Sequence, residues 1–147
     1  MELATKVVLI SLLSCFSIED LRRREIGFFP ALAGILVLFA MRLLGVPRER
    51  EVLTWMLKLL PGALYLLMAL WKGDKVGYGD GVCMLMAGIA LWPGELLYGL
   101  LGTLIPLFVI VVYRKGTGTW RKDKVIPYIP VLTTGILLGI FWQCLAI

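Results

Sequence analysis

Long apolar runs separated by short polar stretches are the feature that most restricts how this chain can fold. A helix that crosses the bilayer needs about 20 apolar residues, so 147 residues leave room for about six crossings and short loops. Only 17% of the residues are charged, against roughly 25% in an average soluble domain. We therefore predict an all-α, polytopic membrane protein with a single domain, residues 1–147. The predicted transmembrane helices cover residues 3–19, 26–45, 52–71, 80–92, 94–113 and 125–146.

The first apolar run is predicted to be a membrane helix rather than a secretory signal. A signal peptide carries basic residues before its apolar core, whereas here Arg22, Arg23 and Arg24 follow the core. A turn is predicted at Trp92-Pro93-Gly94, because Pro and Gly end a helix. Gly99 and Gly102, with Thr103, are expected to allow close helix packing. The tryptophans are interpreted as interfacial anchors: Trp55, Trp71, Trp92, Trp120 and Trp142.

The distribution of basic residues predicts the orientation in the membrane. The loops at 20–25, 72–79 and 114–124 hold ten of the 15 Lys and Arg residues. Because cytoplasmic loops carry an excess of Lys and Arg, we expect these loops in the cytoplasm and the N-terminus outside. The net charge of +5 comes from these clusters rather than from one soluble basic face, so it does not indicate a nucleic-acid partner.

The three cysteines do not indicate a metal site or a disulfide framework. Cys15, Cys83 and Cys144 lie far apart within apolar runs, and the chain contains no Cys-x-x-Cys pair and no His. We interpret them as small buried hydrophobic residues. Neither a metal nor a cofactor is expected.

Two aspartates, Asp20 and Asp80, are the candidate catalytic residues. Asp20 follows the first apolar run and Asp80 opens the fourth, so both fall on the same predicted side of the membrane. An ionisable residue at the end of a membrane helix is costly unless it meets water, a partner or a substrate. Alternatively, Asp80 only complements the dipole of a helix N-terminus. Two carboxyls that share one proton can hydrolyse an amide, the ionised one activating water and the protonated one donating to the carbonyl oxygen.

The residues beside these aspartates are candidate substrate contacts. Gly77, Tyr78 and Gly79 directly precede Asp80, and glycine permits unusual backbone angles and close approach of another chain. An extended peptide could therefore lie along this backbone. Glu19 and Glu25 are candidate contacts for a basic substrate, although a solvated loop charge is the usual explanation for such residues.

At these motifs the chain resembles the type IV prepilin peptidases, intramembrane aspartyl proteases of the Gly-x-Gly-Asp class. The first motif pairs Asp20 with the following basic residues and Ile26, and the second is Gly77-Tyr78-Gly79-Asp80. The family's Ile-Pro-aromatic-x-Pro stretch is matched by Ile126, Pro127, Tyr128 and Pro130. The chain departs from the family at Gly27-Phe28, where Pro-Asn is frequent, and at Val82, where Lys is frequent.

The resemblance covers nearly the whole chain and implies a peptidase of the inner (cytoplasmic) membrane. Such an enzyme cleaves the short basic leader from prepilin-like or pseudopilin-like membrane proteins of type IV pili and secretion systems, at the cytoplasmic face. The larger members carry a segment with cysteine pairs that is associated with methylation. This chain lacks that segment, so the resemblance is to a peptidase-only form.

Other residues and other functions also fit the sequence. Asp74 and Asp123 compete for the second catalytic place, but each stands among basic residues as a solvated loop charge would, and Glu95 belongs to a turn on the opposite side. A small ion-coupled transporter could use the same two aspartates, although transporters place such acids near the midplane between related halves. A non-catalytic pilus or secretion assembly factor is the third possibility.

Overall fold

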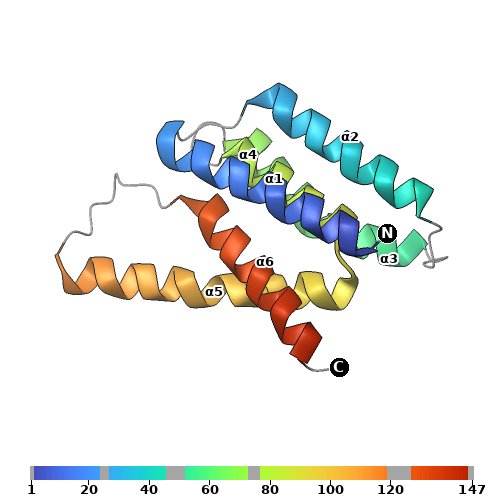
Figure 1. The fold of residues 1–147 in the computed structure, drawn as a ribbon. Coiled ribbons are helices and arrows are strands. Elements are labelled where there is room, and N and C mark those ends of the chain that lie inside the picture. The colour runs from blue at the N-terminus through green and yellow to red at the C-terminus, as the bar shows by residue number, and fades with distance from the viewer. Residues whose placement is uncertain (1, 24–26, 46–51, 73–76, 119–126, 146–147) are drawn as a thin grey trace.

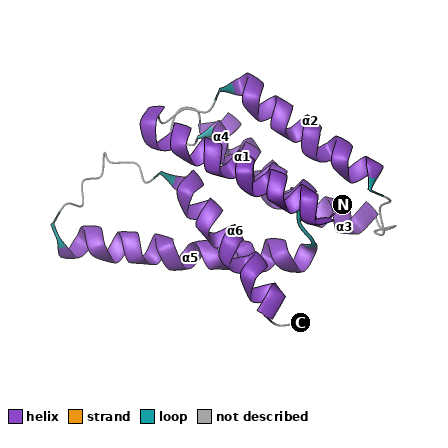
Figure 2. Cartoon of the chain, viewed as in Figure 1, coloured by secondary structure: helices purple, strands orange, loops and turns teal. Residues whose placement is uncertain are grey.

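The computed structural model describes residues 2–23, 27–45, 52–72, 77–118 and 127–145, and it confirms the predicted all-α fold. Within these ranges there is no strand (Figure 2). The observed bounds differ from the predicted ones by a few residues, most of all at the first helix, which continues through Asp20 to Arg23 instead of ending at residue 19. The helices are α1 (Glu2–Arg23), α2 (Phe28–Leu44), α3 (Val52–Lys72), α4 (Tyr78–Ala90), α5 (Pro93–Gly116) and α6 (Tyr128–Leu145).

The turn between α4 and α5 forms where Pro and Gly predicted it. Pro93 takes the first position of α5, where a missing backbone N–H costs nothing. The backbone N–H of Trp92 donates a hydrogen bond to Oε2 of Glu95 at 3.1 Å. This contact caps the start of α5 and holds the acidic side chain inside the protein, where Glu95 is 5% exposed.

The helices form two groups that meet along α1 (Figure 1). On one side, α4 packs against α3 and α2, and on the other side, α5 and α6 cross each other. The Asp80 end of the bundle is formed by the C-terminal ends of α1 and α3 and the N-terminal ends of α4 and α6. The opposite end, here the Glu95 end, contains the N-termini of α1 and α5 and the C-terminus of α6 (Figure 1).

Glycines bring α3 and α4 into backbone contact. A Cβ atom at Gly88 would lie 2.4 Å from the carbonyl oxygen of Lys58, and one at Gly62 would lie 2.7 Å from the backbone N of Leu85. At Gly81 the nearest atoms belong to Leu66, at 2.8 Å. Without side chains at these positions α4 can lie directly on α3. This close contact sets which residues of α3 lie beside Asp80.

Glycines also set the crossing of α5 and α6, as the sequence predicted for Gly99 and Gly102. A Cβ atom at Gly102 would lie 2.8 Å from the carbonyl oxygen of Gly135, and one at Gly139 would lie 2.4 Å from the backbone N of Gly99. Small residues at such contacts allow membrane helices to approach closely and gain van der Waals packing.

Replacing Gly139 by leucine should therefore destabilise the protein by at least the ~1–3 kcal/mol that overpacking usually costs. The added atoms would meet the backbone of α5, which has no rotamer with which to move aside. Reversible unfolding in mixed micelles, followed by circular dichroism, measures the change. Gly116→Leu is the matched control, because a Cβ atom there has nothing within 4 Å. An equal loss for both variants would show that the α5–α6 contact is not responsible.

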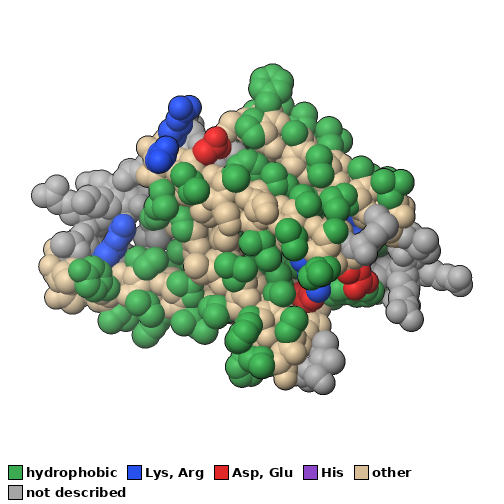
Figure 3. All heavy atoms as spheres, viewed as in Figure 1, with side chains coloured by type: hydrophobic (Ala, Val, Ile, Leu, Met, Phe, Trp, Pro, Cys, Tyr) green, Lys and Arg blue, Asp and Glu red, His purple; other side chains and the backbone are tan. Residues whose placement is uncertain are grey.

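The outer surface is apolar, as expected for a chain surrounded by lipid. Among the described residues, three helical segments are long and apolar enough to cross a membrane, Leu53–Trp71, Pro93–Gly116 and Tyr128–Leu145, and α2 and α4 are shorter apolar helices. Hydrophobic side chains cover the middle of the face seen in Figure 3, while charged side chains lie toward its two ends. Large side chains such as Trp71 and Phe108 are 88% and 70% exposed. In water such a surface would be a liability, whereas lipid covers it.

The cysteine interpretation is wrong for two of the three positions. Cys83 is fully buried against the core, but Cys15 and Cys144 are exposed on the outer faces of α1 and α6. In a membrane protein, a small hydrophobic side chain needs no protein cover, because the bilayer supplies an apolar environment.

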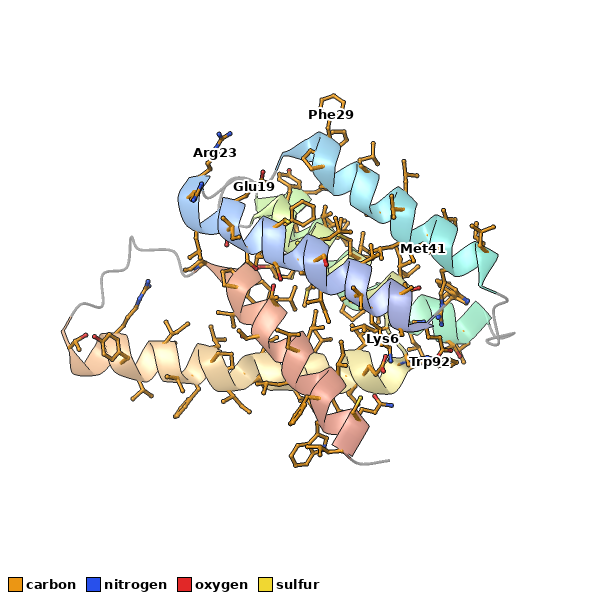
Figure 4. All side chains as sticks on the ribbon, viewed as in Figure 1. Lys6, Glu19, Arg23, Phe29, Met41 and Trp92 are labelled. Atoms are coloured by element: carbon orange, nitrogen blue, oxygen red, sulfur yellow. The ribbon has the colours of Figure 1, made fainter. Side chains whose placement is uncertain are left out.

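A cluster of charged and aromatic side chains lies at the Glu95 end. Glu95 forms an ion pair with Lys6 of α1, and the two side chains are 6% and 19% exposed. The guanidinium of Arg42 lies 5.3 Å from the ring centroid of Trp92, and the ammonium of Lys58 lies 4.8 Å from that of Trp55. Figure 4 shows Lys6 and Trp92 at this end.

These contacts correct one sequence-based interpretation and add to another. Glu95 is not part of the turn itself but a buried residue in the first turn of helix α5, where it pairs with a cation. Trp55 and Trp92 are partners of cations within the protein as well as residues near helix ends, because an aromatic face attracts a positive charge. Glu95 does lie at the end opposite Asp80, as the chain pattern predicted.

Candidate active site

Asp80 is held in the first turn of α4. Gly77 precedes the helix, and its carbonyl oxygen accepts a hydrogen bond from the backbone N–H of Asp80 at 3.2 Å. The expected unusual backbone angle is absent at Gly77, whose φ of −68° and ψ of 121° suit any residue. Its missing side chain matters instead, because a Cβ atom would lie 3.3 Å from Oδ2 of Asp80. The glycine therefore leaves the carboxylate accessible above the backbone.

A tyrosine from α3 contacts the Asp80 carboxylate. The hydroxyl of Tyr65 donates a hydrogen bond to Oδ2 of Asp80 at 3.3 Å. The ring of Tyr65 stacks on Tyr128 with ring centroids 5.9 Å apart and an angle of 16° between the planes. The Tyr128 side chain in turn forms a hydrogen bond with Thr103 of α5. Side chains of α3, α4, α5 and α6 thus converge beside Asp80.

Asp20 approaches Asp80 from α1. The two carboxyls are close enough for their charges to repel each other, and both also interact electrostatically with Cys83, one turn further along α4. Oδ2 of Asp20 is shielded from solvent, although both aspartate side chains remain partly exposed. The structure therefore brings the two predicted catalytic residues together at the Asp80 end, with partial access for water.

A polar contact between α1 and α6 helps to position Asp20. The hydroxyl groups of Ser17 and Thr133 lie 2.9 Å apart, one helical turn before Asp20. A carbonyl oxygen of its own helix also lies within reach of each hydroxyl, that of Leu13 at 2.7 Å from Ser17 and that of Ile129 at 2.8 Å from Thr133. Since a hydroxyl has one hydrogen, one of the two donates across the helices while the other donates to its own carbonyl. Hydrogen bonds between membrane helices add to the packing of small residues. This contact fixes the rotation of α1 against α6, and hence the direction of Asp20.

The other predicted site residues are only partly placed. Glu19 lies near the end of α1 with its Oε2 atom buried, and Figure 4 shows it at the same end of the helix as Arg23. Tyr78 is 51% exposed and Gly77 and Gly79 adjoin the carboxylate, so a peptide could reach this segment. Several predictions fall outside the described residues: Glu25, Ile26, Asp74, Trp120, Asp123 and Ile126.

Sequence reasoning missed Tyr65 and the contacts of Tyr128. Tyr128 stood in the Ile-Pro-aromatic-x-Pro stretch without an assigned role, and Tyr65 lies 15 residues before Asp80 inside an apolar helix. A usable signal existed, because a tyrosine hydroxyl within the protein requires a hydrogen-bond partner. Identifying that partner required the register of α3 against α4, which the apolar pattern does not provide.

The arrangement offers two interacting carboxyls and the hydroxyl of Tyr65. Within the described ranges no three His, Cys, Asp or Glu side chains gather as a metal site would require. Comparisons of the chain with protein-family models, with curated proteins and with solved structures find no match.

Proposed function

We propose that this chain is an aspartyl endopeptidase of the membrane that removes the short basic leader from prepilin-like proteins. The observation that carries the proposal is the pairing of Asp20 and Asp80, which come from distant parts of the chain and interact at one end of the bundle. Paired carboxyls that can reach water are the machinery of amide hydrolysis without metal or nucleophile.

The pair would work by sharing one proton. The ionised carboxyl takes a proton from water as the water oxygen bonds to the scissile carbonyl carbon, and the protonated carboxyl gives its proton to the carbonyl oxygen. In the resulting diol, the newly ionised carboxyl takes a proton back from a hydroxyl. The other carboxyl delivers its proton to the leaving nitrogen, the C–N bond breaks, and the starting protonation state returns.

The surroundings of the pair suit a membrane-anchored peptide with a basic leader. Asp20 and Asp80 lie at helix ends rather than at the centre of the apolar surface, so a substrate helix in the bilayer would present its leader at their level. Glu19, beside Asp20, adds a negative charge that would attract basic residues. We place the Asp80 end at the cytoplasmic face of the inner membrane, following the distribution of Lys and Arg.

Purified protein in detergent, mixed with a prepilin-like membrane protein, tests the proposal directly. The expected result is a shorter product whose new N-terminus, identified by mass spectrometry, lies just before the hydrophobic helix of the substrate. A panel of pilin-like and pseudopilin-like substrates that all remain intact would contradict the proposal. In that case ion flux into proteoliposomes would test the transporter alternative.

Turnover is expected to have a bell-shaped dependence on pH. Two coupled carboxyls titrate in two steps, and only the singly protonated pair contains both an acid and a base. Activity should therefore fall at low pH, where both carboxyls are protonated, and at high pH, where both are ionised. Cleavage assays in matched buffers across the acidic and neutral range measure the profile. A flat profile would argue against a carboxyl pair.

A further inference from the structure

The hydrogen bond from Tyr65 makes the two aspartates of the pair inequivalent. The Tyr65 hydroxyl donates to Oδ2 of Asp80, and its ring is held in place by the nearly parallel ring of Tyr128. A donor aimed at a carboxyl stabilises the ionised form, because a carboxylate oxygen accepts more strongly than a carboxylic acid does. Burial of Asp80 and the neighbouring Asp20 charge favour the protonated form of Asp80, and the Tyr65 hydroxyl opposes both, so it shifts the shared proton in the direction of Asp20.

We infer that Tyr65 is a positioning residue that keeps Asp80 ionised, so that Asp80 is the base that activates water and Asp20 is the acid. This inference rests on the proposed function and assigns separate roles within it. Asp80 would take the proton from water, and Asp20 would give its proton to the carbonyl oxygen of the scissile bond. Tyr65 itself exchanges no proton with the substrate.

The position of Tyr65 supports a directing role over a purely structural one. Helix α3 is fixed against α4 by the glycine contacts at Gly62, Gly81 and Gly88. These contacts define the position of the Tyr65 hydroxyl along α4 relative to Asp80. The described titratable groups that interact with Asp80 include Asp20 of α1, Tyr65 of α3, Cys83 of α4 and Tyr128 of α6. Of these four, Tyr65 donates a hydrogen bond to the carboxylate.

Tyr65→Phe tests the inference, because it removes the hydroxyl and keeps the ring that stacks on Tyr128. The acidic limb of the pH–rate profile should move to higher pH by about one unit, so that activity on that limb falls roughly tenfold. Tyr113→Phe, at an exposed position near the end of α5, is the control and should leave the profile unchanged. A merely structural role would lower activity by a similar factor at every pH, and that result would overturn the inference.

A second variant gives an effect of opposite sign. A fluorinated tyrosine at position 65 is a stronger hydrogen-bond donor, so it should move the acidic limb to lower pH. If instead the alkaline limb responds to both changes, the Tyr65 contact acts on the acid of the pair, and the assignment of roles to Asp20 and Asp80 is wrong.

A readout that needs no turnover separates this inference from the proposed function. Carboxyl carbon NMR of aspartate-labelled protein follows the ionisation of Asp80 directly when Asp20→Asn, Asp74→Asn and Asp123→Asn are combined, because Asp80 is then the one aspartate left. Tyr65→Phe in that background should move the titration midpoint of Asp80 to higher pH by about one unit. An unmoved midpoint would contradict the inference even in an active enzyme. A moved midpoint in a protein that cleaves nothing would leave the Tyr65 contact supported and the peptidase proposal rejected.

Discussion

Replacing either Asp20 or Asp80 by asparagine is expected to lower the rate of leader cleavage by several orders of magnitude. Asparagine has nearly the shape of aspartate but neither accepts nor donates a proton at these pH values, so the pair loses its acid or its base. Because the two carboxyls act as one unit, the double variant should be about as inactive as either single variant. Initial rates of product formation by the purified variants measure the loss.

Folding controls make this prediction specific. Both substitutions remove one member of a repelling pair of carboxyls, so neither variant should unfold more readily than the parent protein. Asp80→Asn also keeps an oxygen that can accept from Tyr65. Glu2→Gln is the matched control, because Glu2 is an exposed acid in the first turn of α1, at the end opposite the pair. Cleavage by the double variant at the parental rate would exclude the carboxyl mechanism.

Breaking the Lys6–Glu95 ion pair should be among the most destabilising single changes in the chain. Lys6→Met leaves the Glu95 carboxylate, with a side chain only 6% exposed, without its cation. Removing one partner of a buried pair typically costs about 3–5 kcal/mol, because the remaining charge loses its compensation. Unfolding in mixed micelles measures this cost for the purified variant.

A double-variant cycle separates the ion pair from the side chains that form it. Lys6→Met combined with Glu95→Leu removes both charges and should regain most of the lost stability, since well-packed apolar side chains often replace a buried pair at little cost. Lys115→Met, at an exposed position of α5, controls for the general effect of losing a lysine. If Lys6→Met is as stable as this control, the ion pair contributes little. Cleavage activity at the opposite end should persist in the folded fraction.

The order and approximate bounds of the six helices were predictable from the sequence. Apolar runs, interrupted by basic clusters and by Trp92-Pro93-Gly94, identify each helix because hydrocarbon leaves the backbone few alternatives. The extension of α1 through Asp20 to Arg23 was missed. A run of charged residues ends the apolar signal, but it does not end helical hydrogen bonding, so hydropathy alone places the boundary too early.

The candidate site was predictable in part. Asp20 and Asp80 stood out because ionisable residues at membrane helix ends are costly, and a shared side of the membrane made their meeting plausible. Tyr65 and Ser17 did not stand out, since each lies within an apolar run where a polar side chain has many possible partners. The neighbours of Tyr65 depend on backbone contacts between α3 and α4 at glycines such as Gly62 and Gly88. The apolar periodicity of the sequence does not predict which residues meet at these contacts.

The sequence by itself determined that this protein is helical, that lipid surrounds much of it, and which two acids fall at one end of the helices. Those properties follow from composition and order along the chain, because each helix must satisfy its own backbone in hydrocarbon. Only the tertiary structure decided that Tyr65 contacts Asp80 and that Glu95 is paired with Lys6. Such contacts depend on how far helices slide and rotate against each other, which is set by close packing between residues far apart in the chain.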